Sequence, residues 1–83
     1  MDRIRLNLYF AAADVSVECT MDAGICLQDH IRNICEMEKS RFSGIYRYSG
    51  NEIVYEQSTG QFCDTHVSLK ALGLCSGRRL TVL

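Results

Sequence analysis

Hydrophobic and polar residues alternate in two runs at the start of the chain. The first run places apolar residues at every second position from Ile4 to Phe10, and the second does so from Val15 to Met21. A period of two is typical of a strand with one buried and one hydrated face. Because only the short segment 11–14 separates the two runs, they predict an antiparallel hairpin.

The stretch 22–37 changes to a helical spacing. Its main apolar residues fall on one face of a helix: Leu27, Ile31, Ile34 and Cys35. We expect Asp22 to cap the amino end of this helix, because its carboxylate can accept hydrogen bonds from the free amides of the first turn. A single amphipathic helix among strands predicts one sheet that covers its apolar stripe.

Shorter alternating pieces follow the helix. The sequence predicts a third strand at 45–48, a glycine turn at 49–51 and a short fourth strand at 53–55. The polar segment 57–61 has no periodicity, so we expect a loop there. The last alternating run, 79–83, predicts a final strand.

The segment before the last strand carries a helix-stop signal. Residues 68–72 predict one helical turn, and Gly73 follows at the position where a left-handed residue is needed. Leu74 is then placed to contact Leu69, as in a Schellman motif.

The order of these elements predicts a single α+β domain over residues 1–83. A hairpin, a helix that crosses its face and a final strand parallel to the first strand together form a β-grasp. The expected sheet is mixed, with strand order 2-1-5-3-4, and one central helix packs on one of its faces.

Net charge and hydropathy exclude several classes of protein. The net charge of −1 gives no basis for general nucleic-acid binding, which needs a strong basic excess. No apolar run approaches the about 20 residues that a membrane span needs, so we expect no direct membrane insertion. The start of the chain alternates and does not form a signal-peptide core. We therefore expect a cytoplasmic protein.

The cysteine pattern bears on redox state and cofactors. The five cysteines are odd in number, and no two are spaced as Cys-x-x-Cys. This pattern disfavours a disulfide framework and a zinc site, and free thiols fit a reducing cytoplasm. We expect neither a metal nor a cofactor.

One pair of residues raises the question of catalysis. His66 lies near Cys63 in the sequence, and a neighbouring imidazolium can lower the pKa of a thiol. Nothing nearby supplies an oxyanion hole, and a domain of 83 residues has little room for a substrate cleft. We interpret the pair as a loop cysteine and a loop histidine and predict that the chain is not an enzyme. A thiol-dependent enzyme built on this pair is the catalytic alternative.

The element order resembles that of ubiquitin-like domains along nearly the whole chain. The closing pattern is similar to the end of ubiquitin without a gap: Leu69-x-x-Leu72-Gly-Leu74-x-x-Gly-x-x-Leu80-x-Val82. The segment 46–50, Tyr-Arg-Tyr-Ser-Gly, looks like the third strand of ubiquitin and its glycine turn.

A closer resemblance is to the YukD/EsaB family, small ubiquitin-like proteins of bacterial type VII secretion loci. It rests on chain length, on an alternating strand directly after the start methionine, and on the closing pattern Gly73-Leu-Cys-Ser-Gly77-Arg-Arg-Leu80-Thr-Val-Leu83. The resemblance implies a cytoplasmic accessory or regulatory component of a type VII secretion system. Its implied partners are the cytoplasmic domains of the secretion machinery, which would hold it at the inner face of the membrane. The alternative is an adaptor domain of the Ras-association or another ubiquitin-like class in a larger protein.

Conjugated ubiquitin-like proteins act through a flexible C-terminal Gly-Gly that threads into an activating enzyme. This sequence ends at Thr81-Val-Leu83, inside the predicted last strand. We therefore expect a non-catalytic protein-binding module and not a conjugated modifier.

The predicted partner-binding surface is the outer face of the sheet, where ubiquitin binds most of its partners. Residues two apart on a strand share a face. The predicted strands place these residues on or beside it: Arg5, Ile45, Arg47, Arg79, Thr81 and Leu83. Arg47 takes the place of the central isoleucine of ubiquitin's patch. We expect the arginines to bind an acidic partner, since guanidinium groups bind carboxylates bidentately; a plain hydrated face is the alternative.

Overall fold

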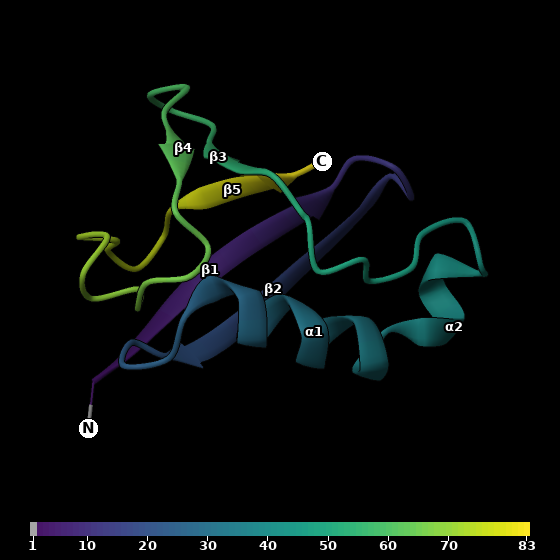
Figure 1. Ribbon diagram of the computed structural model, residues 1–83, viewed down its shortest axis with the longest axis horizontal. Helices are drawn as coiled ribbons and strands as arrows, with labels where there is room; N and C mark the ends of the chain where they lie inside the picture. Colours follow the sequence, from purple (N-terminus) through teal and green to yellow (C-terminus); the bar gives the residue numbers. More distant parts are fainter. Residues whose placement is uncertain (1) are drawn as a thin grey trace.

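The computed structural model describes residues 2–83 and contains one five-stranded sheet with a helix across one face (Figure 1). The predicted hairpin is formed by β1 (Arg3–Phe10) and β2 (Val15–Asp22), which pair antiparallel along their full length. The last strand, β5 (Arg79–Val82), lies parallel to β1. This parallel pairing is the feature that makes the hairpin and the closing strand a β-grasp.

The remaining strands complete the predicted order but lie later in the chain than predicted. β3 (Val54–Glu56) pairs antiparallel with β5, and β4 (Phe62–Cys63) pairs antiparallel with β3. The order β2-β1-β5-β3-β4 confirms the expected 2-1-5-3-4 arrangement. The predicted third strand at 45–48 is wrong, because that segment is irregular and pairs with no strand. Its alternation comes from Tyr46 and Tyr48, which pack against the core from an extended loop.

The central helix starts later than the sequence suggested. α1 spans Leu27–Met37, and its N-cap residue is Cys26, which makes no capping hydrogen bond through its side chain. The prediction that Asp22 caps the helix is therefore wrong. Asp22 ends β2 opposite Arg3, and its Oδ1 accepts a hydrogen bond from the Gly24 amide at 2.8 Å. Asp22 is paired with Arg3 in the β1–β2 ladder, so residues 23–26 separate it from the first residue of the helix.

A second, short helix follows α1. α2 (Lys39–Phe42) has Ser43 as its C-cap residue, which is left-handed with φ 52°. The helix buries the side chain of Phe42. The ring of Phe42 lies 5.0 Å from that of Phe10, centroid to centroid. This aromatic contact closes the core at the carboxyl end of α1.

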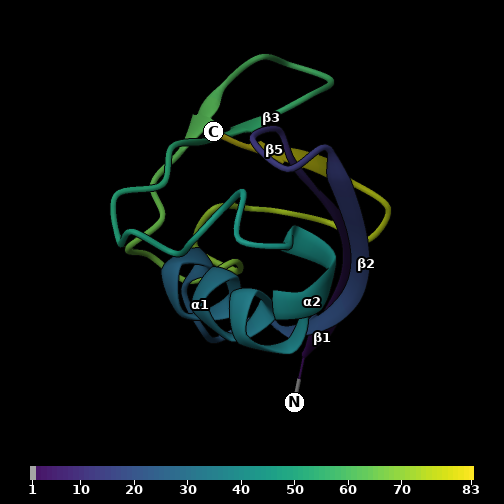
Figure 2. The same cartoon turned by 90° about the vertical axis from the view of Figure 1, so that its right-hand side faces the viewer.

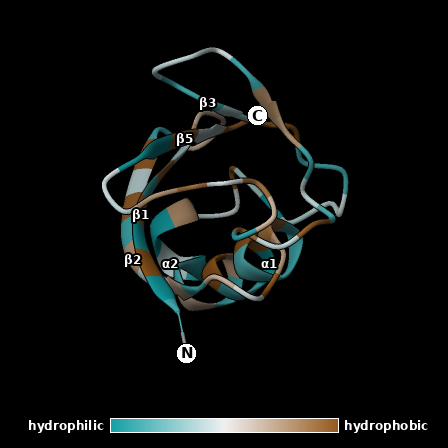
Figure 3. Cartoon of the chain, turned by 90° about the vertical axis from the view of Figure 1, so that its left-hand side faces the viewer, coloured by the Kyte–Doolittle hydropathy of each residue, from teal (hydrophilic) through white to brown (hydrophobic). Residues whose placement is uncertain are grey.

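The core lies between α1 and the sheet, which curves around the helix (Figure 2). The apolar stripe of the helix is buried as predicted: Leu27, Ile31, Ile34 and Cys35. It packs with the inward residues of β1 and β5, including Leu6, Leu8 and Leu80. Hydrophobic and hydrophilic residues alternate along β1 and β2 (Figure 3), so in these two strands the face toward α1 is apolar and the outer face is largely polar. None of the helices within residues 2–83 is long and apolar enough to cross a membrane.

The helix stop before β5 has the predicted Schellman geometry. The Leu74 amide donates to the Leu69 carbonyl at 3.3 Å, and the Gly73 amide donates to the Lys70 carbonyl at 3.1 Å. Gly73 has φ 71°, a left-handed value that glycine adopts without strain. The motif turns the chain back toward β5 and buries Leu69 completely.

Candidate docking surface on the outer sheet face

The outer face of the sheet is the side away from α1 and α2 (Figure 2). Its side chains come from the alternate strand positions that do not enter the core. One row of them crosses four strands in register: Tyr9, Thr81, Tyr55 and Phe62. Residues directly opposite each other in paired strands lie on the same side of a sheet, so these side chains share the outer face.

Four apolar or aromatic residues form an outer-face cluster over β3, β4 and the end of β5: Ile53, Tyr55, Phe62 and Leu83. Ile53, Phe62 and Leu83 are 53%, 71% and 54% exposed. The Leu83 amide donates to the Ile53 carbonyl at 2.8 Å, so these two residues are neighbours. The rings of Tyr55 and Phe62 meet edge to face, with centroids 6.1 Å apart.

The structure separates the residues that the sequence predicted for this surface. Arg5, Arg79 and Leu83 lie on the outer face and are exposed. Thr81 lies there too, but its exposure is only 4%, because Tyr9 and Tyr55 flank it at the paired positions. Thr81 therefore supports the face from within and offers little surface of its own.

Ile45 and Arg47 are not part of the outer sheet face, because the segment that carries them is not a strand. Both are exposed, and Arg47 helps to line a groove on the helix side. The position opposite Thr81 on the third strand belongs to Tyr55. Arg47 therefore does not lie on the outer sheet face where it was predicted, and Tyr55 is the residue that pairs with Thr81 there.

The two arginines that remain on the outer face differ in their surroundings. Arg5 forms an ion pair with Glu18 of β2 at 2.9 Å, and both side chains are exposed. Arg79 lies beside Asn7 in the sheet and forms no ion pair within residues 2–83. A surface ion pair contributes about 0–1 kcal/mol, so an acidic partner can displace Glu18 from Arg5 at little cost. Both guanidinium groups are thus accessible to an acidic partner.

The aromatic members of the cluster were not predicted from the sequence. Tyr55 belonged to the predicted fourth strand, which was placed at the sheet edge, and Phe62 lies just after a polar segment without periodicity. The β-branched and aromatic run Ile-Val-Tyr at 53–55 was the available signal, since such residues favour central strands. No signal in the sequence indicated the two-residue strand that presents Phe62.

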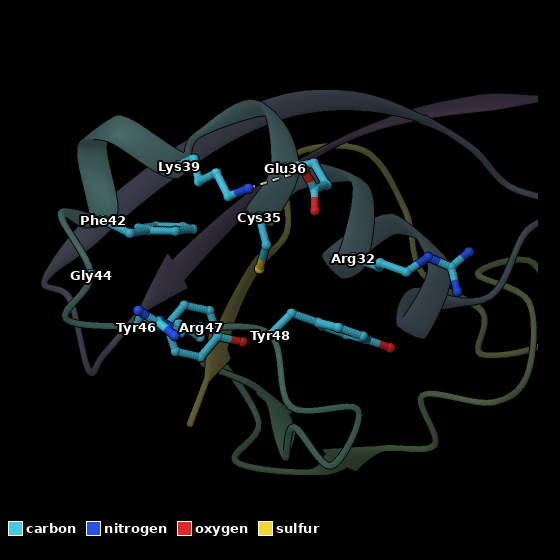
Figure 4. Close-up of a pocket in the computed structure, with 9 residues that line it drawn as sticks. All are labelled: Arg32, Cys35, Glu36, Lys39, Phe42, Gly44, Tyr46, Arg47 and Tyr48. Atoms are coloured by element: carbon cyan, nitrogen blue, oxygen red, sulfur yellow. Dashed lines mark ion pairs between the residues drawn. The ribbon is translucent and has the colours of Figure 1, made fainter.

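The helix-side groove is bounded by α1, α2 and the segment 44–48 (Figure 4), and has a volume of about 610 Å³. Its lining includes Cys35, Phe42, Tyr46 and Arg47. Burial raises the pKa of the Cys35 thiol above its usual range, so the thiol stays protonated near neutral pH. The groove is thus lined by aromatic rings and a neutral thiol, with charged groups beside them.

The structure gives no sign of an activated thiol at Cys63. Burial, together with the nearby Glu56 carboxylate, raises the pKa of Cys63. An activated cysteine needs the opposite shift. His66 is exposed, and its backbone amide donates to Asp64 Oδ1 at 3.0 Å. Within residues 2–83, no group of three or more His, Cys, Asp or Glu side chains is placed to hold a metal ion.

Comparison with known proteins shows a shared fold. The sequence matches no protein-family model and no curated protein sequence. Among solved structures, a chain described under molecular mimicry of SUMO that promotes DNA repair aligns with a TM-score of 0.80 and 13% identity. That alignment covers 100% of this chain and 92% of the other.

Two further structures are informative. The ubiquitin-like domain of ECCD1, a type VII secretion system protein of Mycobacterium tuberculosis, aligns with a TM-score of 0.64 and 14% identity over 100% of this chain and 99% of that one. A chain of the toluene 4-monooxygenase HD complex aligns with a TM-score of 0.75 and 10% identity, covering 98% and 96%. Likeness at these identities establishes the fold alone, which is the ubiquitin-like β-grasp.

Proposed function

We propose that this chain is a non-catalytic module that binds a partner protein through the outer face of its sheet. The observation that carries the proposal is the exposed outer-face cluster. Single exposed apolar residues are ordinary on protein surfaces, whereas a contiguous group on an uncovered sheet marks an interaction site. Aromatic residues such as Tyr55 and Phe62 are enriched in protein interfaces, where they bury large areas at a small entropic cost.

The arginines on the same face favour an acidic rim on the partner. Arg79 lies on β5, next to the strand that carries Tyr55, and Arg5 lies one strand farther away, on β1. Guanidinium groups bind carboxylates in a bidentate manner, and their stems cover neighbouring apolar surface. Charge complementarity of this kind acts mainly on the rate of association and weakens as salt is added. The proposed interface thus has an apolar centre and a basic margin.

The proposed setting is the cytoplasm, as an accessory or regulatory component of a type VII secretion system. Two features support it: the resemblance of the closing segment to the YukD/EsaB family, and the fold that the chain shares with the ECCD1 domain. The proposed partner is a cytoplasmic domain of the secretion machinery, through which the chain would reach the inner face of the membrane. An adaptor domain of the Ras-association or another ubiquitin-like class is the second candidate.

The gene neighbourhood separates these two settings. A type VII accessory component predicts adjacent genes for a secretion ATPase and for small helical secreted proteins. An adaptor predicts an open reading frame that continues into another domain. Neighbouring genes without any secretion component would contradict the first setting and leave the docking surface to be tested separately.

Partner capture with matched variants tests the docking surface. Phe62→Ser on the outer face is compared with Met37→Ser at the end of α1, because both side chains are 71% exposed. We expect Phe62→Ser to reduce capture of the partner strongly and Met37→Ser to leave it unchanged, with the same circular dichroism for both. Equal capture by the two variants would contradict binding through the outer face.

A further inference from the structure

The walls of the helix-side groove are held in place by partly buried hydrogen bonds. The Tyr46 hydroxyl donates to Glu52 Oε2 at 2.6 Å, and Gln28 Nε2 donates to the Tyr48 hydroxyl at 2.6 Å. Glu52 is buried and also accepts the Ser49 amide at 2.7 Å. These bonds fix both tyrosines before any ligand arrives. A preorganised wall spares a ligand the entropic cost of ordering it.

The interior of the groove is apolar. The rings of Phe42 and Tyr46 meet edge to face with centroids 5.4 Å apart. The Cys35 side chain points from α1 into the space between Phe42 and the two tyrosines (Figure 4). The helix-side groove therefore fits an aliphatic or aromatic side chain of a ligand, because dispersion contacts and the release of water favour burial of that side chain.

The charged groups of the groove are mainly basic. Arg32, Lys39 and Arg47 line it, against the single acidic residue Glu36. Lys39 pairs with Glu36 at 3.7 Å, and Arg32 pairs with Asp29 at 3.2 Å, outside the lining. Both ion pairs are exposed and therefore weak, so Arg32 and Lys39 can each bind a carboxylate of a partner in place of Asp29 and Glu36. Arg47 forms no ion pair within residues 2–83.

We propose that the helix-side groove binds a short acidic segment of a partner protein. An apolar side chain of that segment packs in the groove against Tyr46 and Tyr48, and neighbouring carboxylates meet Arg47 and Lys39. The chain as a whole has a net charge of −1, so it lacks the long-range attraction on which nucleic-acid binding depends. This site is separate from the outer-face cluster and does not depend on it.

The test is a titration of the isotope-labelled full chain with three blocked hexapeptides, followed by NMR. The first has the sequence Asp-Glu-Phe-Leu-Asp-Glu, the second replaces its acids by lysine, and the third replaces Phe-Leu by Gly-Gly. We expect the first peptide to shift the amides of Cys35, Tyr46 and Arg47 in a saturable way. The second and third peptides should leave those amides unchanged, because each lacks one of the two required features.

Charge-reversal variants separate this site from the outer face. Arg47→Glu should weaken binding of the first peptide by about tenfold, the scale of one lost ionic contact in a preformed site. Arg79→Glu makes the same charge change on the outer face and should leave peptide affinity unchanged. If Arg79→Glu loses partner capture but still binds the first peptide, the partner binds the outer face and the groove is a separate site.

Alkylation provides a second readout that does not rely on a variant. The first peptide should slow the reaction of Cys35 at the groove with a small alkylating reagent, while Cys75, which is exposed, reacts at its usual rate.

Four results would overturn the proposal. The first is the absence of a saturable shift with the first peptide, and the second is an equal shift with the lysine peptide. The third is an equal shift with a hexathymidylate, which would indicate nucleic-acid binding. The fourth is a shift of the groove amides that depends only on protein concentration. The last of these would make a second copy of this chain the occupant.

Discussion

The β1–β2 hairpin and the segment 44–63 are held together in different ways. The hairpin pairs two strands of eight residues each, and its register follows from the alternation of the sequence. The segment 44–63 contains strands of only three and two residues. Its path depends on a few polar contacts, above all those of Glu52. Periodicity therefore specifies the first region, and individual side chains specify the second.

Both candidate sites depend on the less regular region. The outer-face cluster takes Ile53, Tyr55 and Phe62 from it, and the helix-side groove takes Tyr46 and Arg47. The hairpin and α1 supply the rigid frame against which this segment packs. Functional residues are often carried by irregular segments on a regular scaffold, because loops can vary without loss of the core.

The largest expected effect comes from the regular region. Ile31→Ala removes a completely buried side chain from the stripe of α1 and should lower the free energy of unfolding by about 2–5 kcal/mol. Asn33→Ala, on the exposed side of the same helix, is the control and should change stability little. Urea denaturation measures both. Equal shifts of the two denaturation midpoints would mean that the helix does not pack on the sheet through this stripe.

A smaller effect is expected in the irregular region. The two carboxylate oxygens of Glu52 accept hydrogen bonds from the backbone amides of Ser49 and Gly50, one each, and in Glu52→Gln an NH2 group replaces one oxygen and faces one of these donors. We expect a loss of about 1–3 kcal/mol, typical of a buried polar group left without a partner. Hydrogen exchange should accelerate in 44–52 and stay slow in the β1–β2 hairpin. Uniform acceleration along the chain would contradict the contrast between the two regions.

The same carboxyl group predicts a dependence on pH. Burial by itself would raise the pKa of Glu52, but hydrogen bonds from the Ser49 amide and the Tyr46 hydroxyl outweigh burial and lower it. A carboxyl with a lowered folded pKa stabilises the fold above its unfolded pKa of about 4.3, and this contribution disappears as pH falls through the folded value. The stability difference between wild type and Glu52→Gln should therefore shrink in acid. Denaturant titrations at several pH values measure it; a difference that persists in strong acid would contradict the lowered pKa.

The smallest effect concerns the thiols and leaves stability unchanged. Burial raises the pKa values of Cys19 and Cys35, whereas Cys75 is exposed. In the native protein we expect rapid alkylation of Cys75 and slow alkylation of the other two, resolved by mass spectrometry. Comparable rates for Cys35 and Cys75 would show that the region between α1 and the segment 44–48 opens readily.

The features that could be predicted from the sequence are those that depend on period or on backbone conformation. The hairpin and the helix stripe followed from repeated spacing, and the sheet order followed from the order of the elements along the chain. The Schellman stop at Gly73 followed from the requirement for a left-handed residue. Each of these patterns involves several residues that are close in the sequence, so one unusual residue does not hide the pattern.

The features that could not be predicted depend on which of several short segments joins the sheet. The two tyrosines of 45–48 alternate like strand residues, but hydrogen bonds to Glu52, six residues away, and to Gln28, 20 residues away, hold them in a loop. That displacement moved Arg47 away from the outer face and put Tyr55 beside Thr81. Asp22 was misassigned because a cap and a strand end favour the same residue type.

Mapping the interface in the complex tests the central claim most directly. The isotope-labelled chain would be bound to the partner that Phe62→Ser fails to capture, and cross-saturation from the partner measured at each amide. We predict saturation at Ile53, Tyr55 and Leu83 on the outer face, with none on the exposed side of α1. Saturation on α1 alone, with the outer face unaffected, would contradict the account.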